Sequence, residues 1–470
     1  MTQWCGRVVL FVGVTTMPVG VSAQASTTGP AAAPQVFTLE SAIQYAVEHY
    51  PTVRVALEQV NVSTAGLAVA RASYLPRLDS FWQSNRATAN NVFGQVLPQA
   101  VLPSISGPVL PSSSAQSVWG SATGALFSWE LADFGLRRAT VAGAEAAVAA
   151  ARAGETLTRL DVQSAVAAEF LAMLSAQRAV TAAQADVDRR DTLARAVHTL
   201  VDNQLRPGAD ASRIDAERAA AQTRLIRAQA LLTVANTTLA RVLGVTAGAV
   251  SIDGANLLNR VPAADVPESA AKAHPLVQVR QAAVDVAHAQ QEVLARTDAP
   301  RVHLQSSVFA RGSGANPTGT FDGGLEGLGL DRVNWAAGVQ VVFPNAFDFS
   351  SLRARKAGAA AFAREETARY DEALLTVSSQ HQAAAAMVQA SRAVAANTPV
   401  QLAAAQHGEA QATARYQAGL ASVIEVAEAQ NLLAQAEVQD QLGRVDVWRA
   451  LLVEAVAQGN LASFLTLLRP

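Results

Sequence analysis

The sequence predicts a mainly α-helical protein with two β-hairpins, built from one arrangement of elements that occurs twice. The duplication is visible in two proline-bounded segments: 25 residues separate Pro51 from Pro76, and 25 separate Pro275 from Pro300. Each segment leads into alternating apolar and polar residues and then into a very long helical pattern, which in the first copy has no proline over 136–206. Because an internal repeat outweighs local patterns, the predicted order is helix, strand, strand, long helix, turn and helix, twice.

The first 25 residues resemble a secretory signal peptide in their layout. Arg7 is the only charge before the apolar run 8–14, and residues 21–23 form a small-residue cleavage site. A transmembrane anchor is the alternative, but the run is short and Pro18 follows it closely. We expect a cleaved signal at 1–25 and then a flexible segment at 26–36.

Repeat 1 is predicted to cover residues 37–243. Thr38 fits the N-cap of a short helix, and Pro51 fits the first position of the next helix. A long stretch rich in Gly, Pro, Ser and Asn then separates two segments of alternating pattern. The expected elements are strands at about 77–86 and 118–129 and a helical hairpin at 136–243.

Repeat 2 is predicted to cover residues 274–459. It follows a linker, 244–273, in which Gly and Pro interrupt every helical pattern, and it precedes a C-terminal tail, 460–470. Pro399 is expected to kink or interrupt the outgoing long helix. The expected elements are strands at about 301–311 and 335–343 and a helical hairpin at 352–458.

The long helices carry apolar residues every seven positions. This spacing is typical of coiled-coil seams, and a helix of some 70 residues is roughly 100 Å long, which no compact core accommodates. The sequence therefore predicts an elongated assembly with seams of plain core packing. The seam positions are Val166, Met173, Val180, Val187, Ala194 and Val201, then Leu225, Leu232 and Leu239, and in repeat 2 Val438, Val445 and Leu452.

The predicted strands carry aromatic residues near their ends. Such residues form interface belts where strands cross a lipid bilayer. After the N-terminal segment the chain has no apolar run of 18 residues, so any membrane crossing would have to use strands. An ordinary two-stranded edge of a soluble domain explains the same pattern.

The sequence shows no grouping of residues that is typical of a catalytic or ligand-binding site. The formal net charge is −2, which gives no electrostatic reason to expect nucleic acid binding. The seven histidines are scattered without metal-ligand spacing, and no phosphate-binding loop or nucleophile motif is present. The single cysteine, Cys5, lies in the signal segment, so we expect neither a disulfide nor a lipid anchor. We therefore expect no catalytic, cofactor or metal site and no enzyme activity.

Over residues 37–459 the sequence resembles the TolC family of outer membrane efflux proteins. The most specific likeness is at 416–430, where a tyrosine, a glycine and two acidic residues surround a helix break. The paired proline elements and the segment 133–138, Asp-Phe-Gly-Leu-Arg-Arg, add to it.

The resemblance implies a homotrimer, in which each protomer gives four strands to a twelve-stranded barrel in the outer membrane. The helices would continue this barrel across the periplasm. Such proteins are passive exit ducts of tripartite efflux or type I secretion systems, and they work with a periplasmic adaptor (membrane fusion protein) and an inner-membrane pump. A periplasmic coiled-coil scaffold or adaptor without a membrane barrel is the alternative.

The resemblance also assigns roles at the helical tips. Glu425 and Glu428 match the acidic pair of the family's periplasmic constriction, and a spacing of three places them on one helix face. Three chains would then surround the mouth with six carboxylates, which favour cations. A helix start, where acidic side chains complement the helix dipole, is the alternative explanation.

The same likeness covers the latch and the docking tips. Tyr416 matches the tyrosine of the family's closed-state latch, and Asp215 matches the aspartate that accepts its hydrogen bond. The latch arginine falls on Ala421, so a different contact is expected to hold the closed state. Adaptors of the family dock at the two hairpin tips, which correspond here to Gly419 with Leu420 and to Pro207 with Gly208.

Overall fold

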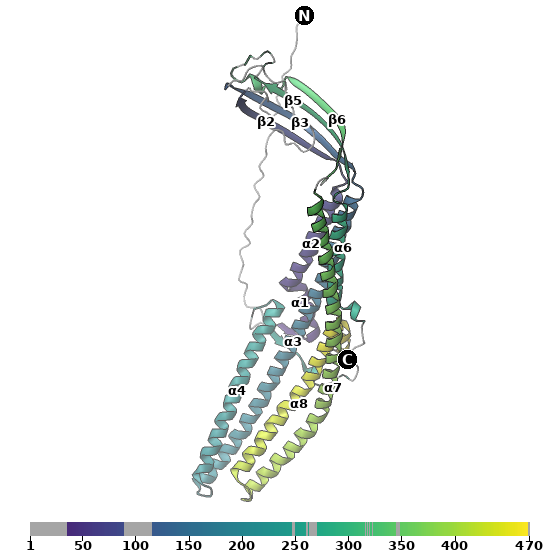
Figure 1. The fold of residues 1–470 in the computed structure, drawn as a ribbon. Helices are drawn as coiled ribbons and strands as arrows, with labels where there is room; N and C mark the ends of the chain where they lie inside the picture. Colours follow the sequence, from purple (N-terminus) through teal and green to yellow (C-terminus); the bar gives the residue numbers. More distant parts are fainter. Residues whose placement is uncertain are drawn as a thin grey trace.

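The computed structural model describes residues 35–88, 115–246, 250–259, 262, 270–314, 316, 318, 320, 321, 323–344 and 348–468. The molecule is elongated, with one β-sheet at one end and two long helical hairpins that reach away from it (Figure 1). Helices dominate and four long strands form the sheet, which confirms the predicted mainly α fold class. Among the described residues, no helix is long and apolar enough to span a membrane.

The sheet joins the two repeats edge to edge. Its strand order is β2-β3-β5-β6, all antiparallel, and the central β3–β5 pairing links the repeat 1 hairpin to the repeat 2 hairpin. The sequence predicted the strands within each repeat but not this pairing. The strands are β2 (Arg77–Thr88), β3 (Ser117–Ala132), β5 (Arg301–Ser313) and β6 (Arg332–Val342).

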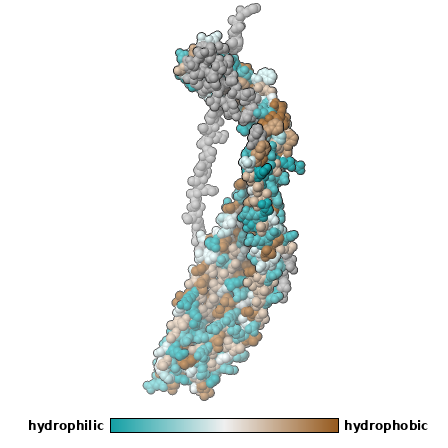
Figure 2. All heavy atoms as spheres, viewed as in Figure 1, coloured by the Kyte–Doolittle hydropathy of each residue, from teal (hydrophilic) through white to brown (hydrophobic). Residues whose placement is uncertain are grey.

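The two faces of the sheet differ in polarity. Directly paired residues share a face, and the register therefore places large exposed apolar side chains together on one face. These residues are Leu78, Trp82, Val308, Val333, Trp335, Val339 and Val341. Hydrophobic residues also gather where the sheet meets the helices (Figure 2). The opposite face carries polar residues such as Gln305, which is buried.

Two helical hairpins form the long shaft. The first is α3 (Leu136–Asp202) with α4 (Gly208–Leu243), and the second is α7 (Phe349–Gln417) with α8 (Val423–Ala457). Every residue of the predicted seams is buried or half-buried, as coiled-coil packing requires. Two shorter helices, α2 (Pro51–Ala72) and α6 (Pro275–Arg296), pack against α3 between the hairpins and the sheet (Figure 1).

Both short helices begin as the duplicated sequence predicted. Pro51 and Pro275 each occupy the first helical position, where the missing N–H costs no hydrogen bond. Thr38 caps the preceding helix α1 (Leu39–His49) in a reciprocal capping box with Ser41.

Pro399 does not interrupt its helix. The α7 helix runs through it without a break, so that part of the prediction is wrong. Its neighbour Thr398 is buried and donates a hydrogen bond to Asp440 of α8 at 3.3 Å. Packing of Thr398 against α8 therefore helps to hold the helix where Pro399 removes a backbone hydrogen bond.

Three segments for which the sequence predicted no helix or strand contain such elements. Within the expected flexible segment, β1 (Gln35–Phe37) pairs in parallel with β4 (Val250–Ile252) of the linker. The linker also holds α5 (Ala255–Asn259) and a 3₁₀ turn, η1 (Ala271–Ala273). The expected C-terminal tail forms α9 (Leu461–Leu468).

The main hydrophobic core explains why these segments are ordered. Phe37 and Ile252 from the small sheet and Phe464 from α9 are buried in it. The ring of Trp448 lies edge to face with Phe464 at 5.9 Å, and its indole N–H donates to the Leu257 carbonyl at 2.7 Å. Burial of these side chains stabilises the three segments.

Candidate periplasmic gate at the helical tips

The two hairpin tips lie at the same end of the molecule, far from the sheet (Figure 1). At the first tip Gln204 has a positive φ of 58°, and Pro207 is the N-cap of α4. At the second, Gly419 has φ 75°, which a residue with a side chain rarely adopts. Each tip presents one exposed leucine, Leu205 at 69% and Leu420 at 71%.

The two acidic residues lie on the exposed side of the first turns of α8. Val426 and Ala427 between them are buried, so Glu425 and Glu428 point away from the tip core. Glu425 accepts a hydrogen bond from the Ser422 backbone N–H at 3.3 Å and completes a capping box. It also lies 3.9 Å from Arg415. In one protomer Glu425 thus stabilises the helix start, which is the alternative that the sequence left open.

The expected hydrogen bond between Tyr416 and Asp215 is not formed. Asp215 on α4 instead faces α3 of the same hairpin, where its Oδ1 lies 3.0 Å from Nε2 of His198. Tyr416 is only 3% exposed and packs with Ile214, Val423 and other apolar residues of the tip core. Its hydroxyl has no hydrogen-bond partner among the described residues. Burial raises the pKa of this hydroxyl, so it stays neutral and retains its proton.

An arginine from the opposite hairpin holds Tyr416 instead. The Arg206 guanidinium lies 4.7 Å from the centre of the Tyr416 ring and donates a hydrogen bond to the Tyr416 carbonyl at 3.3 Å. A cation over an aromatic face is attractive, and it is stronger when partly desolvated. Arg206 belongs to the first tip and Tyr416 to the second, so this contact joins the two hairpins.

Two further arginines of α3 contact α8. Arg189 forms a two-pronged ion pair with Glu437, at 3.0 and 2.7 Å. Arg190 is 0% exposed and donates to the Asn431 side chain at 2.6 Å, while Asp186 and Glu217 of its own hairpin balance its charge at 3.0 Å each. We call Arg189, Arg190 and Arg206 the arginine clasp.

Sequence reasoning missed the clasp. Its one visible signal was an excess of arginine on α3, with Arg189 and Arg190 adjacent and Arg206 at the turn. Their partners lie more than 200 residues away in the chain, and only the packing of the first hairpin against the second brings them together.

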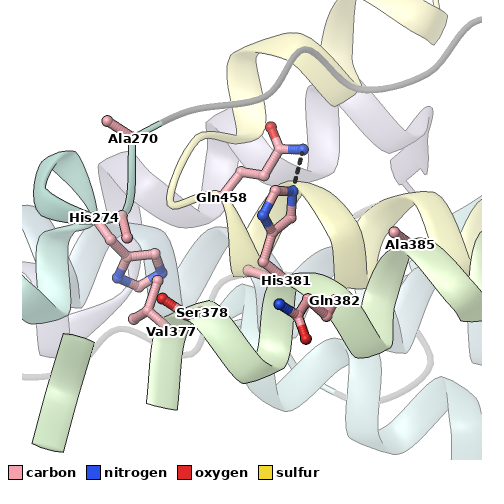
Figure 3. A pocket seen from close by; sticks show the side chains of 10 residues that line it. Ala270, His274, Val377, Ser378, His381, Gln382, Ala385 and Gln458 are labelled. Atoms are coloured by element: carbon pink, nitrogen blue, oxygen red, sulfur yellow. Dashed lines mark hydrogen bonds between the residues drawn. The ribbon is translucent and has the colours of Figure 1, made fainter. Parts of the chain in front are cut away.

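A cavity of about 390 Å³ lies between η1, α7 and the end of α8, far from the tips (Figure 3). His274 uses both ring nitrogens: it accepts from the Leu276 N–H at 3.1 Å and donates to the Val456 carbonyl at 3.0 Å. His381 lies 3.4 Å from the Gln458 side-chain amide. Among the described residues, no three His, Cys, Asp or Glu side chains are grouped as a metal site would require.

A comparison with known protein families matches the chain in two segments that correspond to the two repeats. The family model for outer membrane efflux proteins matches residues 42–245 and 266–451. A search of curated proteins finds no match.

Solved structures share the fold. CusC superposes with a TM-score of 0.75 at 15% identity, covering 92% of this chain and 96% of CusC. VceC from Vibrio cholerae gives 0.71 at 18% identity, with 90% and 96% covered. The open state of the Neisseria gonorrhoeae MtrE outer membrane channel gives 0.70 at 19%, with 90% and 89% covered. Since the family model spans both repeats, the chain belongs to the outer membrane efflux protein family: it is an outer membrane efflux channel whose helical hairpins lie in the periplasm.

Proposed function

We propose that this channel is the passive exit duct of a tripartite efflux or type I secretion system, formed by three copies of the chain. The observation that carries this proposal is the pair of open sheet edges. Within the described residues, β2 and β6 each pair on one side only. In lipid, unpaired backbone N–H and C=O groups cost several kcal/mol each, so an open sheet does not persist there. Three four-stranded sheets joined edge to edge satisfy every strand and enclose a lumen.

The apolar face of the sheet supports the same assembly. Exposed Trp82, Trp335 and their valine and leucine neighbours would face the acyl chains, and the polar face would line the lumen. Detergent-purified protein is expected to be trimeric by light scattering and to give channels of reproducible conductance in planar bilayers. Soluble monomer that gives no channels would contradict the proposal.

The alternative, a periplasmic coiled-coil scaffold or adaptor, leaves the apolar sheet face without a partner. Cell fractionation separates the two functions. The duct is expected in the outer membrane fraction and to resist high-salt extraction, whereas a scaffold would be released by salt or remain soluble.

We propose further that Glu425 and Glu428 line the periplasmic constriction of the trimer. Both side chains are exposed and leave the tip core toward solvent, which is what a ring of six carboxylates requires. The double variant Glu425→Gln with Glu428→Gln is expected to lower cation preference in bilayer recordings. Gln also completes a capping box, so the helix start is preserved. Unchanged ion selectivity would mean that these residues do not line the constriction.

The adaptor is proposed to dock on the tips, around Pro207 and Gly208 on one and Gly419 and Leu420 on the other. Exposed leucines at the extreme end of a periplasmic shaft are suited to bury against a protein partner. Leu205→Glu with Leu420→Glu is expected to abolish efflux in cells and to leave bilayer conductance intact. Leu231→Glu, at an equally exposed site on α4, serves as the control.

We propose that the arginine clasp holds the gate closed. The clasp supplies, from the first hairpin, the charged link that the family pattern places at position 421 in the second hairpin. Opening by movement of the second hairpin would have to break the contacts of Arg206, Arg189 and Arg190 with that hairpin.

A further inference from the structure

An apolar groove of about 510 Å³ lies midway along the helical shaft. Its floor is formed by the last turns of α8, and α3 and α7 form its two walls. Met387, Leu452 and Val453 supply large apolar side chains, and alanines from all three helices leave space between them. No charged side chain is among the described residues that line the groove. Its volume is within the range of about 300–1,000 Å³ that small-molecule sites usually have.

The groove opens on the bare face of the helix layer. The other face is covered by the short elements β1, β4, α5 and α9. Trp448 of α8 points toward these elements: its indole N–H donates to the Leu257 carbonyl of α5, and its ring contacts Phe464 of α9. Because an α-helix turns by about 100° per residue, Val453 lies about 140° around α8 from Trp448. The groove and the short elements therefore lie on opposite faces of the layer.

In the proposed duct, the bare face is the wall of the lumen. The long helices lie side by side in the order α4, α3, α8 and α7 (Figure 1), and three such layers joined at α4 and α7 would close a ring. If the short elements faced inward, three copies of them would fill this ring, so they face the periplasm. The groove is centred over α8, inside the edges where the next copy joins, and therefore stays open to the lumen.

The groove differs in polarity from the wall beside it. Asp446 and Arg449, two turns and one turn before Val453, share its side of α8 and form an ion pair at 2.9 Å. Within the groove Met387 and Val453 are 55% and 46% exposed, so apolar surface is in contact with water there. A solute that displaces this water gains the free energy of apolar burial. The flexible thioether of Met387 can adapt to solutes of different shape.

We propose that this groove binds uncharged apolar solutes, of the size of a few fused rings, as they pass through the lumen. The inference rests on the proposed trimeric duct, in which three grooves would lie at one level of the wall. A charged solute would lose hydration there without gaining a counter-charge, so the lining selects against it. Because the groove lies between the sheet and the tips, a solute reaches it from the sheet end while the gate is closed (Figure 1).

The test records the current through the full-length protein in planar bilayers, with naphthol as the probe. Naphthol, an uncharged alcohol with two fused rings, is expected to reduce the current in a concentration-dependent way. Met387→Gln with Val453→Gln should raise the half-blocking concentration about tenfold, the equivalent of roughly two methylene groups that no longer bury against the probe. Both side chains are exposed, so the double variant keeps the packing of the helices.

Ala383→Phe separates a groove from a wall that is merely apolar. Ala383 is exposed on the α7 wall, where a phenyl group would fill the groove and add apolar surface at the same time. The half-blocking concentration should therefore rise in this variant as well, because the probe loses its space. A lower value would mean that naphthol adheres to any apolar surface, and it would overturn the site.

Val394→Gln is the matched control. Val394 lies on α7 two turns from Met387, has the same exposed fraction of 55% and is outside the groove. It should give the block of the wild type, and a loss equal to that of the double variant would overturn the proposal. Absence of block in the wild type, or unchanged block in the double variant, would also overturn it and leave the duct standing. If the double variant kept its block and lost its trimer in light scattering, a neighbouring copy would be the occupant instead. A protein that forms no channels would contradict the duct itself and with it the site.

Discussion

If the arginine clasp holds the proposed periplasmic gate closed, replacement of Arg206 by glutamine is expected to open it. The variant removes a cation over the Tyr416 ring, worth about 0.5–2 kcal/mol in a partly desolvated site. It also removes a hydrogen bond to the Tyr416 carbonyl, worth about 0.5–1.5 kcal/mol. Together the closed state would lose about 1–3.5 kcal/mol per protomer, which shifts the closed-to-open equilibrium by about 5- to 400-fold.

Single-channel recording in planar bilayers measures this shift as open probability and mean conductance. Arg206→Lys should fall between wild type and Arg206→Gln, since it keeps the charge and loses the planar stack. Arg213→Gln removes an exposed charge from the same tip and should behave as wild type. If Arg206→Gln and Arg213→Gln gave the same open probability, Arg206 would not hold the gate.

The partner of Tyr416 can be tested separately. Its hydroxyl has no described partner and Asp215 contacts His198, so Tyr416→Phe and Asp215→Asn should both leave the gate closed. A latch through the tyrosine hydroxyl and Asp215 would instead open in both variants. The pair of results therefore distinguishes stacking on Arg206 from the bond that the family resemblance implies.

Two further predictions concern stability. Arg190→Met should destabilise the detergent-solubilised protein by about 1–3 kcal/mol, because Asp186 and the half-buried Glu217 would both lose Arg190 as a partner while Arg224 still pairs with Asp186 at 2.7 Å; a Tm equal to that of the wild type would refute this. Burial opposes ionisation of Asp133, but hydrogen bonds from the Arg137 and Gly135 N–H groups outweigh it and hold the pKa below the usual value. A lowered pKa gives stability that is present above about pH 4 and is lost as the pH falls. The cost of Asp133→Ala, about 0.5–2 kcal/mol at neutral pH, should therefore shrink on acidification, and a pH-independent cost would contradict this.

Much of the fold is determined by local patterns that are visible in the sequence. The equal proline spacing places α2 and α6, and the seven-residue apolar period identifies the seams of the long hairpins. What could not be predicted depends on partners distant in the chain. The strand β1 has three residues, and it is held by pairing with Val250–Ile252 and by burial of Phe37 in the core. The helix continues through Pro399, where the neighbouring Thr398 is buried against α8, a contact that no propensity scale includes.

The candidate gate shows the same limit at the level of single residues. The acidic pair could be located because it matches the family pattern after Gly419, and helix geometry places residues three apart on one face. The role of Arg206 could not be predicted, because it depends on how the two hairpins pack against each other.

Position 421 explains why the charged link had to come from the other hairpin. Ala421 is buried in the tip core with Tyr416, Val423 and Ile214, where a long charged side chain would lose hydration without a partner. Apolar packing at this position brings the tips close enough for Arg206 to reach over the Tyr416 ring. In the proposed gate, the small residue on one hairpin and the arginine on the other therefore act together, and neither can be interpreted from its own hairpin alone.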